Sequence, residues 1–194
     1  MQKRNLTGEK IIKAAFALAE EIGFDRVTFQ KIADKLHIKY PSLYNHFDNM
    51  DALKTEMTVY VIRILNFKLM QGLVGKSGED AIRQFAHIYR DFAFENREAY
   101  KLFMNIPSTK NKEINCMARE TMSIIKSILN FYIDDRVILV HKSRELRSIL
   151  HGFVSLTFLG YFQHKPDVEV EDSFEFMIDD FIFSIENGKS PDCN

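Results

Sequence analysis

Apolar residues recur along most of this chain at spacings of three and four, which is the period of amphipathic α-helices. The clearest series runs from Ile114 to Tyr132, and a second runs from Ile82 to Ala93. No segment alternates apolar and polar residues convincingly enough to indicate a β-sheet. The pattern therefore predicts an all-α protein of about nine helices.

Breaks in this pattern predict two helical domains joined by one long helix. Asn49 is suited to cap a helix that runs to about Met70, and three glycines between residues 71 and 79 then interrupt the apolar series. Ser77-x-x-Asp80 has the spacing of a capping box, so the next helix should open there. The expected domains are residues 1–50, a linking helix over about 50–70, and residues 71–194.

The stretch before residue 37 has the signals of a short helix with a defined start. Val27 and Ile32 have the spacing of a hydrophobic staple around a Thr28 N-cap. The helix should therefore begin at Phe29, with Ile32 and its apolar neighbours facing inward and the lysines facing water.

A second short helix should start near Pro41, because the fixed φ and missing N–H of proline suit a first helical turn. Leu43 and Phe47 are four residues apart and give this helix an apolar side. The remaining positions point elsewhere: Lys39 at the entrance, then Tyr40, Ser42, Tyr44, Asn45 and His46. In a major groove, Ser and Asn side chains bond base edges, and Tyr and His bond phosphates. The alternative is a solvated helical hairpin that binds nothing.

The chain from Thr7 to Leu53 resembles the N-terminal domain of the TetR-type (TetR/AcrR) transcriptional regulators. The matching residues are Ile11, Ala14, Ala15, Leu18, Glu21, Gly23, Phe24, Thr28, Ile32, Ala33, Leu36, Pro41, Ser42, Leu43, Tyr44, His46, Phe47 and Leu53. The resemblance implies a three-helix helix-turn-helix domain followed by a larger helical domain for ligand binding and dimerisation. The segment from Leu150 to Leu156, which contains His151-Gly152, also resembles the C-terminal domain of one subgroup with a His-Gly motif.

The resemblance also implies roles for single residues on a double-stranded DNA operator. Thr28, Tyr44 and His46 would hold phosphates, and Thr28 would do so at the positive end of its helix. Lys39, Tyr40, Pro41, Ser42 and Asn45 would meet bases, with Pro41 able to touch a thymine methyl group.

Two positions depart from the family pattern. His37 stands where the family has a turn glycine, which costs free energy if φ is positive there, although His tolerates that region better than most residues. Met50 stands where the family has a lysine that opens the fourth helix. Lys54, one turn further along, is the candidate to replace that phosphate contact.

Charge and cysteine usage limit the functions that fit. Residues 1–70 carry 11 Lys and Arg against 8 Asp and Glu, a weak excess that chance would explain equally well, whereas residues 165–194 carry two Lys and nine acids. The C-terminal end is therefore a poor DNA surface. Cys116 and Cys193 have neither metal nor disulfide spacing, and the run from Gly152 to Phe162 is too short to span a bilayer. We expect a cytoplasmic protein with reduced thiols, no metal, no cofactor and no membrane contact.

The last two helices, over about residues 143–163 and 173–187, are apolar around most of their circumference. Such helices must be buried on two sides, and one side can be a symmetric partner. The residues expected at this homodimer interface are Phe153, Leu156, Gly160, Phe174, Met177 and Phe181. A fully buried central helix would explain the same pattern without a partner.

The second domain is rich in adaptable apolar side chains, because the chain holds 17 Phe and 8 Met but no Trp. The candidate effector contacts are Phe85, Tyr89, Phe103, Met104, Met117, Met122, His151 and Phe158. These side chains would equally well fill a core. His151 could orient a ligand, bond a backbone carbonyl or serve the dimer interface.

The leading hypothesis is a ligand-responsive repressor that binds a palindromic operator as a homodimer and is released by a small apolar or amphipathic effector. The alternative is a helical small-molecule sensor without sequence-specific DNA binding. An enzyme is not expected. Cys116 and a histidine could be arranged as a dyad, but no nucleophile elbow, metal-ligand spacing or phosphate loop is present.

Overall fold

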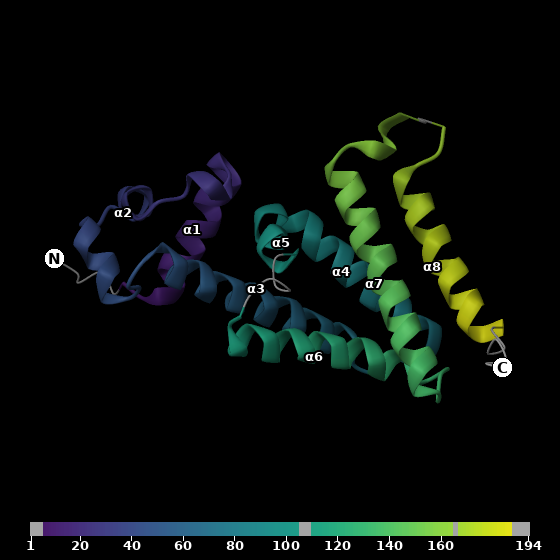
Figure 1. The fold of residues 1–194 in the computed structure, drawn as a ribbon. Coiled ribbons are helices and arrows are strands. Elements are labelled where there is room, and N and C mark those ends of the chain that lie inside the picture. Colours follow the sequence, from purple (N-terminus) through teal and green to yellow (C-terminus); the bar gives the residue numbers. More distant parts are fainter. Residues whose placement is uncertain (1–5, 105–109, 165–166, 188–194) are drawn as a thin grey trace. The chain divides into compact units, whose positions relative to one another are not determined.

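The computed structural model describes residues 6–104, 110–164 and 167–187. These residues form eight α-helices and three short 3-10 helices with no β-strand among them, which confirms the all-α fold class (Figure 1). The chain divides into two compact units. Unit 1 is Met1–Ile64 with Asn96–Ala118, and unit 2 is Leu65–Glu95 with Arg119–Asn194. The sequence pattern suggested units that follow chain order, whereas unit 1 also takes in a segment from beyond residue 95.

Unit 1 holds the helix-turn-helix segment. Its elements are α1 (Gly8–Ile22), η1 (Phe24–Arg26), α2 (Phe29–Leu36), η2 (Tyr40–Asn45), the first part of α3 (Met50–Gly72), α5 (Arg97–Met104) and the start of α6 (Lys112–Leu129). The oxygen of the Asn49 side chain accepts a hydrogen bond from the Ala52 N–H at 2.9 Å, so Asn49 caps α3 as predicted. The core is aliphatic, with Ile11, Ile32, Leu43 and Leu53 fully buried.

Unit 2 holds the end of α3, the rest of α6 and the helices α4 (Gly78–Glu95), α7 (Arg136–Phe158), η4 (Tyr161–His164) and α8 (Val170–Asn187). Helices α4, α7 and α8 pack against one another, and α7 and α8 lie side by side in Figure 1. Asp135 caps α7 by accepting hydrogen bonds from the N–H groups of Val137 and Ile138 at 2.8 and 2.9 Å. Helix α7 therefore starts earlier than the expected residue 143, at a cap that the apolar pattern did not reveal.

Candidate nucleic-acid interface

Thr28 caps α2 in the way that the sequence predicts. Its Oγ1 accepts a hydrogen bond from the Lys31 N–H at 3.3 Å. Val27 and Ile32 are both buried, as a hydrophobic staple requires. The exposed Thr28 therefore lies at the positive end of α2, where the helix dipole favours an anionic group such as a phosphate.

The turn after α2 is built on His37, the one non-glycine residue with positive φ among those the structure describes (φ 53°, ψ 48°). The His37 N–H donates to the Asp34 carbonyl at 3.1 Å, and the Ile38 N–H donates to the Ala33 carbonyl at 3.0 Å. These two bonds form a Schellman motif, which ends α2 and redirects the chain. His37 therefore occupies the left-handed region that glycine adopts without steric cost, and the strain expected at this position is present.

The second helix of the motif, η2, is a 3-10 helix rather than an α-helix. It runs from Tyr40 to Asn45, with Pro41 in its first turn. A run of six residues with a proline at its start has few α-helical hydrogen bonds to form, and short helical pieces of this kind are commonly 3-10. Leu43 and Phe47 are nevertheless both buried, so the predicted apolar side is correct.

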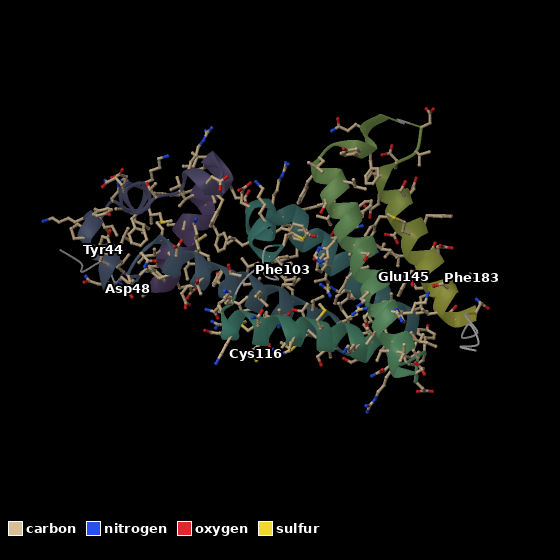
Figure 2. The ribbon with its side chains drawn as sticks, in the orientation of Figure 1. Tyr44, Asp48, Phe103, Cys116, Glu145 and Phe183 are labelled. Atoms are coloured by element: carbon tan, nitrogen blue, oxygen red, sulfur yellow. The ribbon has the colours of Figure 1, made fainter. Side chains whose placement is uncertain are left out.

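Tyr40 and Tyr44 form a pair on the exposed side of η2. Their hydroxyl oxygens are 2.6 Å apart in a hydrogen bond, and their rings meet edge to face with centroids 5.4 Å apart. The ring of Tyr44, labelled in Figure 2, also packs edge to face on the buried Phe29. The hydrogen bond with Tyr40 raises the pKa of the Tyr44 hydroxyl. This hydrogen bond uses one of the two hydroxyl protons of the pair, which leaves the other proton to donate to a phosphate. We did not predict this pair from the sequence, although the spacing of four residues between the two tyrosines could have indicated it.

The other residues expected to contact DNA lie within the same short stretch. Lys39, Pro41, Asn45 and His46 are exposed, and Ser42 is half-buried. The fold therefore leaves all of these side chains accessible to some degree. Their contacts with DNA stay predictions.

The start of α3 holds Met50, the second departure from the family pattern, and Lys54, its candidate replacement. Met50 is half-buried and packs against the core of unit 1. The ammonium nitrogen of Lys54 lies 5.7 Å from the centroid of the Phe24 ring, which is the geometry of a cation–π contact. Lys54 is therefore held against its own unit, and its contact with a phosphate stays a prediction.

A groove of about 780 Å³ lies beside His46, between α1 and α3. Carboxylates line part of it, from Glu9, Glu56 and Asp48, and the last is labelled in Figure 2. Carboxylates repel phosphates. This side of His46 is therefore less favourable to a phosphate, and the contact of His46 with DNA stays a prediction.

The candidate effector contacts fall in both units. Phe103, Met104 and Met117 belong to unit 1, whereas Phe85, Tyr89, Met122, His151 and Phe158 belong to unit 2. Met104 is exposed, and Phe85 and Phe103 are buried. The five residues that belong to unit 2 all lie on its helices. Their role as effector contacts stays a prediction.

Tyr89 on α4 and His151 on α7 are brought together as a hydrogen-bonded pair. The Tyr89 hydroxyl oxygen lies 2.9 Å from Nδ1 and 3.1 Å from Nε2 of His151, and the two rings are perpendicular. Burial, and secondly the positive charge of Arg147, lower the pKa of His151 to about 4. His151 is therefore neutral at physiological pH.

Three of the residues expected at the dimer interface instead form the core of unit 2, because Phe153, Phe174 and Phe181 are almost fully buried. Phe153 packs on Phe174 with ring centroids 4.8 Å apart. Leu156 is exposed, and Met177 and Gly160 are half-buried. Gly160 has φ 78°, so its glycine is required by the turn after α7. The three phenylalanines therefore serve the core of unit 2, and any part they take in a dimer interface stays a prediction.

Large apolar residues in α8 and at the end of α7 remain exposed. Leu159 is 71% exposed, and Phe176 and Phe183 are 71% and 64% exposed. Phe176 and Phe183 are seven residues apart and so share one face of α8, where Figure 2 labels Phe183. Gly152 on α7 has open space where a Cβ would stand. This exposed apolar face, defined by Leu156, Leu159, Phe176 and Phe183, is available to another molecule.

Within the described part of the chain, no three His, Cys, Asp or Glu side chains are grouped closely enough to hold a metal ion. No described helix is both long and apolar enough to cross a membrane.

Two stretches of the chain match models of known protein families. Residues 11–57 match the family model of bacterial regulatory proteins of the tetR family, and residues 82–181 match that of the tetracyclin repressor-like C-terminal domain. The chain is 29% identical over 179 residues to the uncharacterized HTH-type transcriptional regulator YobS of Bacillus subtilis, covering 91% of each protein. It is 27% identical over 169 residues to IcaR, the negative transcriptional regulator of the biofilm operon icaADBC in Staphylococcus epidermidis, covering 85% of this chain and 89% of IcaR. The fold is similar to a TetR variant from Acinetobacter baumannii in complex with minocycline, with a TM-score of 0.67, 18% identity, and coverage of 94% of this chain and 97% of that one.

Proposed function

The chain belongs to the TetR family of bacterial transcriptional regulators, and we propose that it is a repressor that binds a palindromic operator as a homodimer and leaves it when an effector binds. IcaR is named a negative regulator, which supports repression as the sign of control. The protein would act in the cytoplasm and without catalysis, in line with relatives that are named transcriptional regulators.

The observation that carries this proposal is the geometry of the stretch from Thr28 to His46. Thr28 presents a helix N-terminus, and the strained turn at His37 leads directly into η2. Because Leu43 is buried beneath η2, the polar and aromatic side chains around it face away from the core. These side chains suit a major groove, with Tyr44 and His46 on phosphates and the residues from Lys39 to Ser42 on base edges.

The homodimer is proposed from the exposed apolar face of α7 and α8. Large exposed apolar side chains on neighbouring helices are candidates for an interaction site. A two-fold partner would cover Phe176 and Phe183 with the same residues of its own copy, because a two-fold interface is self-complementary. Such a dimer would place two recognition segments on half-sites about 34–36 Å apart, or one helical turn of DNA.

The effector is proposed to bind unit 2 and to act through α3. Helix α3 is continuous from Met50 to Gly72 and contributes residues to both units. A ligand with higher affinity for one position of α3 would shift the population toward it and change operator affinity. The TetR variant crystallised with minocycline shows that a protein of this fold accommodates a small organic molecule.

Selection of bound fragments from host genomic DNA, followed by footprinting of the purified protein, tests the proposed function. We expect a protected palindrome in an upstream region at moderate salt. Binding to no fragment, together with tight capture of a small molecule, would favour the alternative of a sensor without sequence-specific DNA binding. One observation favours that alternative. Lys54, the candidate to replace the missing phosphate contact at the start of α3, packs on Phe24 of its own chain.

A further inference from the structure

Arg147 on α7 differs from the other partly buried arginines of unit 2. Arg90 pairs with Asp91 at 2.7 Å, and Arg83 pairs with Asp179 at 2.5 Å. The Nε of Arg147 is buried too, yet no described residue provides a hydrogen-bond acceptor for it. A buried charged donor without an acceptor is costly, because it has lost water and gained nothing in return. The Nε of Arg147 is therefore a donor that an acceptor from another molecule would satisfy.

The residues near Arg147 are suited to bind an anionic group together with it. His151 follows one turn later on α7, and Tyr89 on α4 is hydrogen-bonded to it. Residues four apart are neighbours on one face of a helix, so Arg147 and His151 lie on the same side of α7. The charge of Arg147 is also one cause of the low pKa of His151. Since His151 is neutral, Arg147 supplies the positive charge of this cluster, and the imidazole and phenol supply neutral donors. We call these three residues the Arg147 cluster.

Aromatic side chains adjoin the Arg147 cluster on both helices. Phe85 stacks with Tyr89 at a centroid distance of 6.2 Å. Phe158 stands seven residues after His151 on the same side of α7, and its ring contacts Phe94. A molecule whose anionic end met Arg147 would therefore place its body among apolar side chains.

We propose that the Arg147 cluster binds the carboxylate of an otherwise apolar effector. A guanidinium binds a carboxylate best through two parallel N–H groups, and the Nε of Arg147, which has no acceptor, can supply one of them. The Tyr89 hydroxyl or a ring N–H of His151 would donate to the same carboxylate. The inference rests on the proposed function, because it names the chemical class of the effector that function requires.

Calorimetric titration of the purified full-length protein, without DNA, tests this inference. The probes are dodecanoate and 4-butylbenzoate, each compared with its alcohol, 1-dodecanol or 4-butylbenzyl alcohol. The wild type should bind at least one acid about tenfold more tightly than the matched alcohol, the preference expected for one charged hydrogen-bonded pair. Arg147→Met should lose that preference and keep its affinity for the alcohol. Arg147→Lys should keep part of it, because the charge remains.

Arg144→Met is the matched control, since Arg144 is an exposed arginine one turn earlier on the same helix. The inference is wrong if the wild type prefers neither acid, or if Arg147→Met and Arg144→Met behave alike. It is also wrong if Arg147→Met changes only the monomer–dimer equilibrium, because Arg147 would then pair with a second copy. Operator binding is measured separately on the same proteins. Its absence in the wild type would contradict the proposed function, whereas intact operator binding without an acid preference would contradict only the effector class.

Discussion

The side-chain carboxylate of Glu98 on α5 accepts a hydrogen bond from the backbone N–H of Phe24, with 3.0 Å between Oε2 and the nitrogen. In return, the Glu98 N–H donates to the carboxylate of Glu20 on α1, also at 3.0 Å. Burial raises the pKa of Glu98, but hydrogen bonds from Lys101 and the Phe24 N–H outweigh it and hold the pKa below its usual value. These reciprocal bonds fasten α5 to the end of α1.

Replacing Glu98 should therefore destabilise unit 1. Glu98→Ala leaves the Phe24 N–H without its acceptor and should lower the free energy of unfolding by about 1–3 kcal/mol. Glu98→Gln keeps an acceptor oxygen and should lose less. Urea unfolding monitored by circular dichroism measures both, with the exposed Glu56→Ala as control. Equal losses in Glu98→Ala and Glu56→Ala would refute this account of α5.

The place of α5 in unit 1 was not predictable from the local pattern, and the contrast with Thr28 explains why. Thr28 caps a helix through a residue three positions away, so spacing alone predicted it. Glu98 and Phe24 are 74 residues apart in the chain. An exposed carboxylate and one that reaches a distant backbone N–H look the same in a sequence. Short-range signals therefore predicted the helix-turn-helix, and contacts across the chain decided which helices join it.

His37→Gly should stabilise the protein while leaving its DNA contacts in place. Glycine adopts the left-handed conformation of this turn without a Cβ clash, and this gain is partly offset by the greater entropy of the unfolded chain. We expect a net gain of about 0.5–1 kcal/mol in thermal or urea unfolding. His37→Val, whose β-branched side chain resists positive φ, should have the opposite effect. A loss of stability in His37→Gly would mean that the imidazole makes a stabilising contact.

Protonation of His151 should destabilise unit 2 in acid. Its folded pKa of about 4 lies below the ordinary 6.5, so the unfolded chain binds the proton more readily. The stability that depends on neutral His151 is present above pH 6.5 and is lost as the pH falls toward 4, by up to about 3 kcal/mol. His151→Gln removes this titration. The difference in unfolding free energy between wild type and His151→Gln should therefore shrink or reverse between pH 6.5 and 4, and a constant difference would contradict the burial of a neutral imidazole.

Polar substitution of the exposed apolar face should dissociate the homodimer. Phe176→Ser and Phe183→Ser remove apolar surface from the proposed interface, and the double variant should sediment as a monomer at concentrations where the wild type is dimeric. Phe131→Ser is the matched control, because Phe131 is a similarly exposed phenylalanine outside α7 and α8. If the double variant, Phe131→Ser and the wild type all have the same mass in solution, this face is not the interface.

The two faces of α7 and α8 show a second limit of sequence reasoning. Both helices are apolar around most of their circumference, so the pattern indicated two buried sides without saying which side is the core. Phe174 and Phe176 differ by two positions and both read as interior residues, yet one is fully buried and the other is exposed. The choice depends on where α4 packs, which local periodicity does not encode. The same limit applies to Arg147. The sequence does not show that its Nε is buried without an acceptor, whereas the structure does.

Operator affinity of the double variant Tyr44→Phe/His46→Ala tests the central claim most directly. Fluorescence anisotropy with a fragment selected from the genome compares it with the wild type and with His141→Ala, an exposed histidine on α7. We expect the double variant to bind at least about tenfold more weakly on every sequence, because two donors to phosphates are lost. We expect His141→Ala to bind like the wild type. A double variant that binds the operator as tightly as the wild type would contradict the central claim.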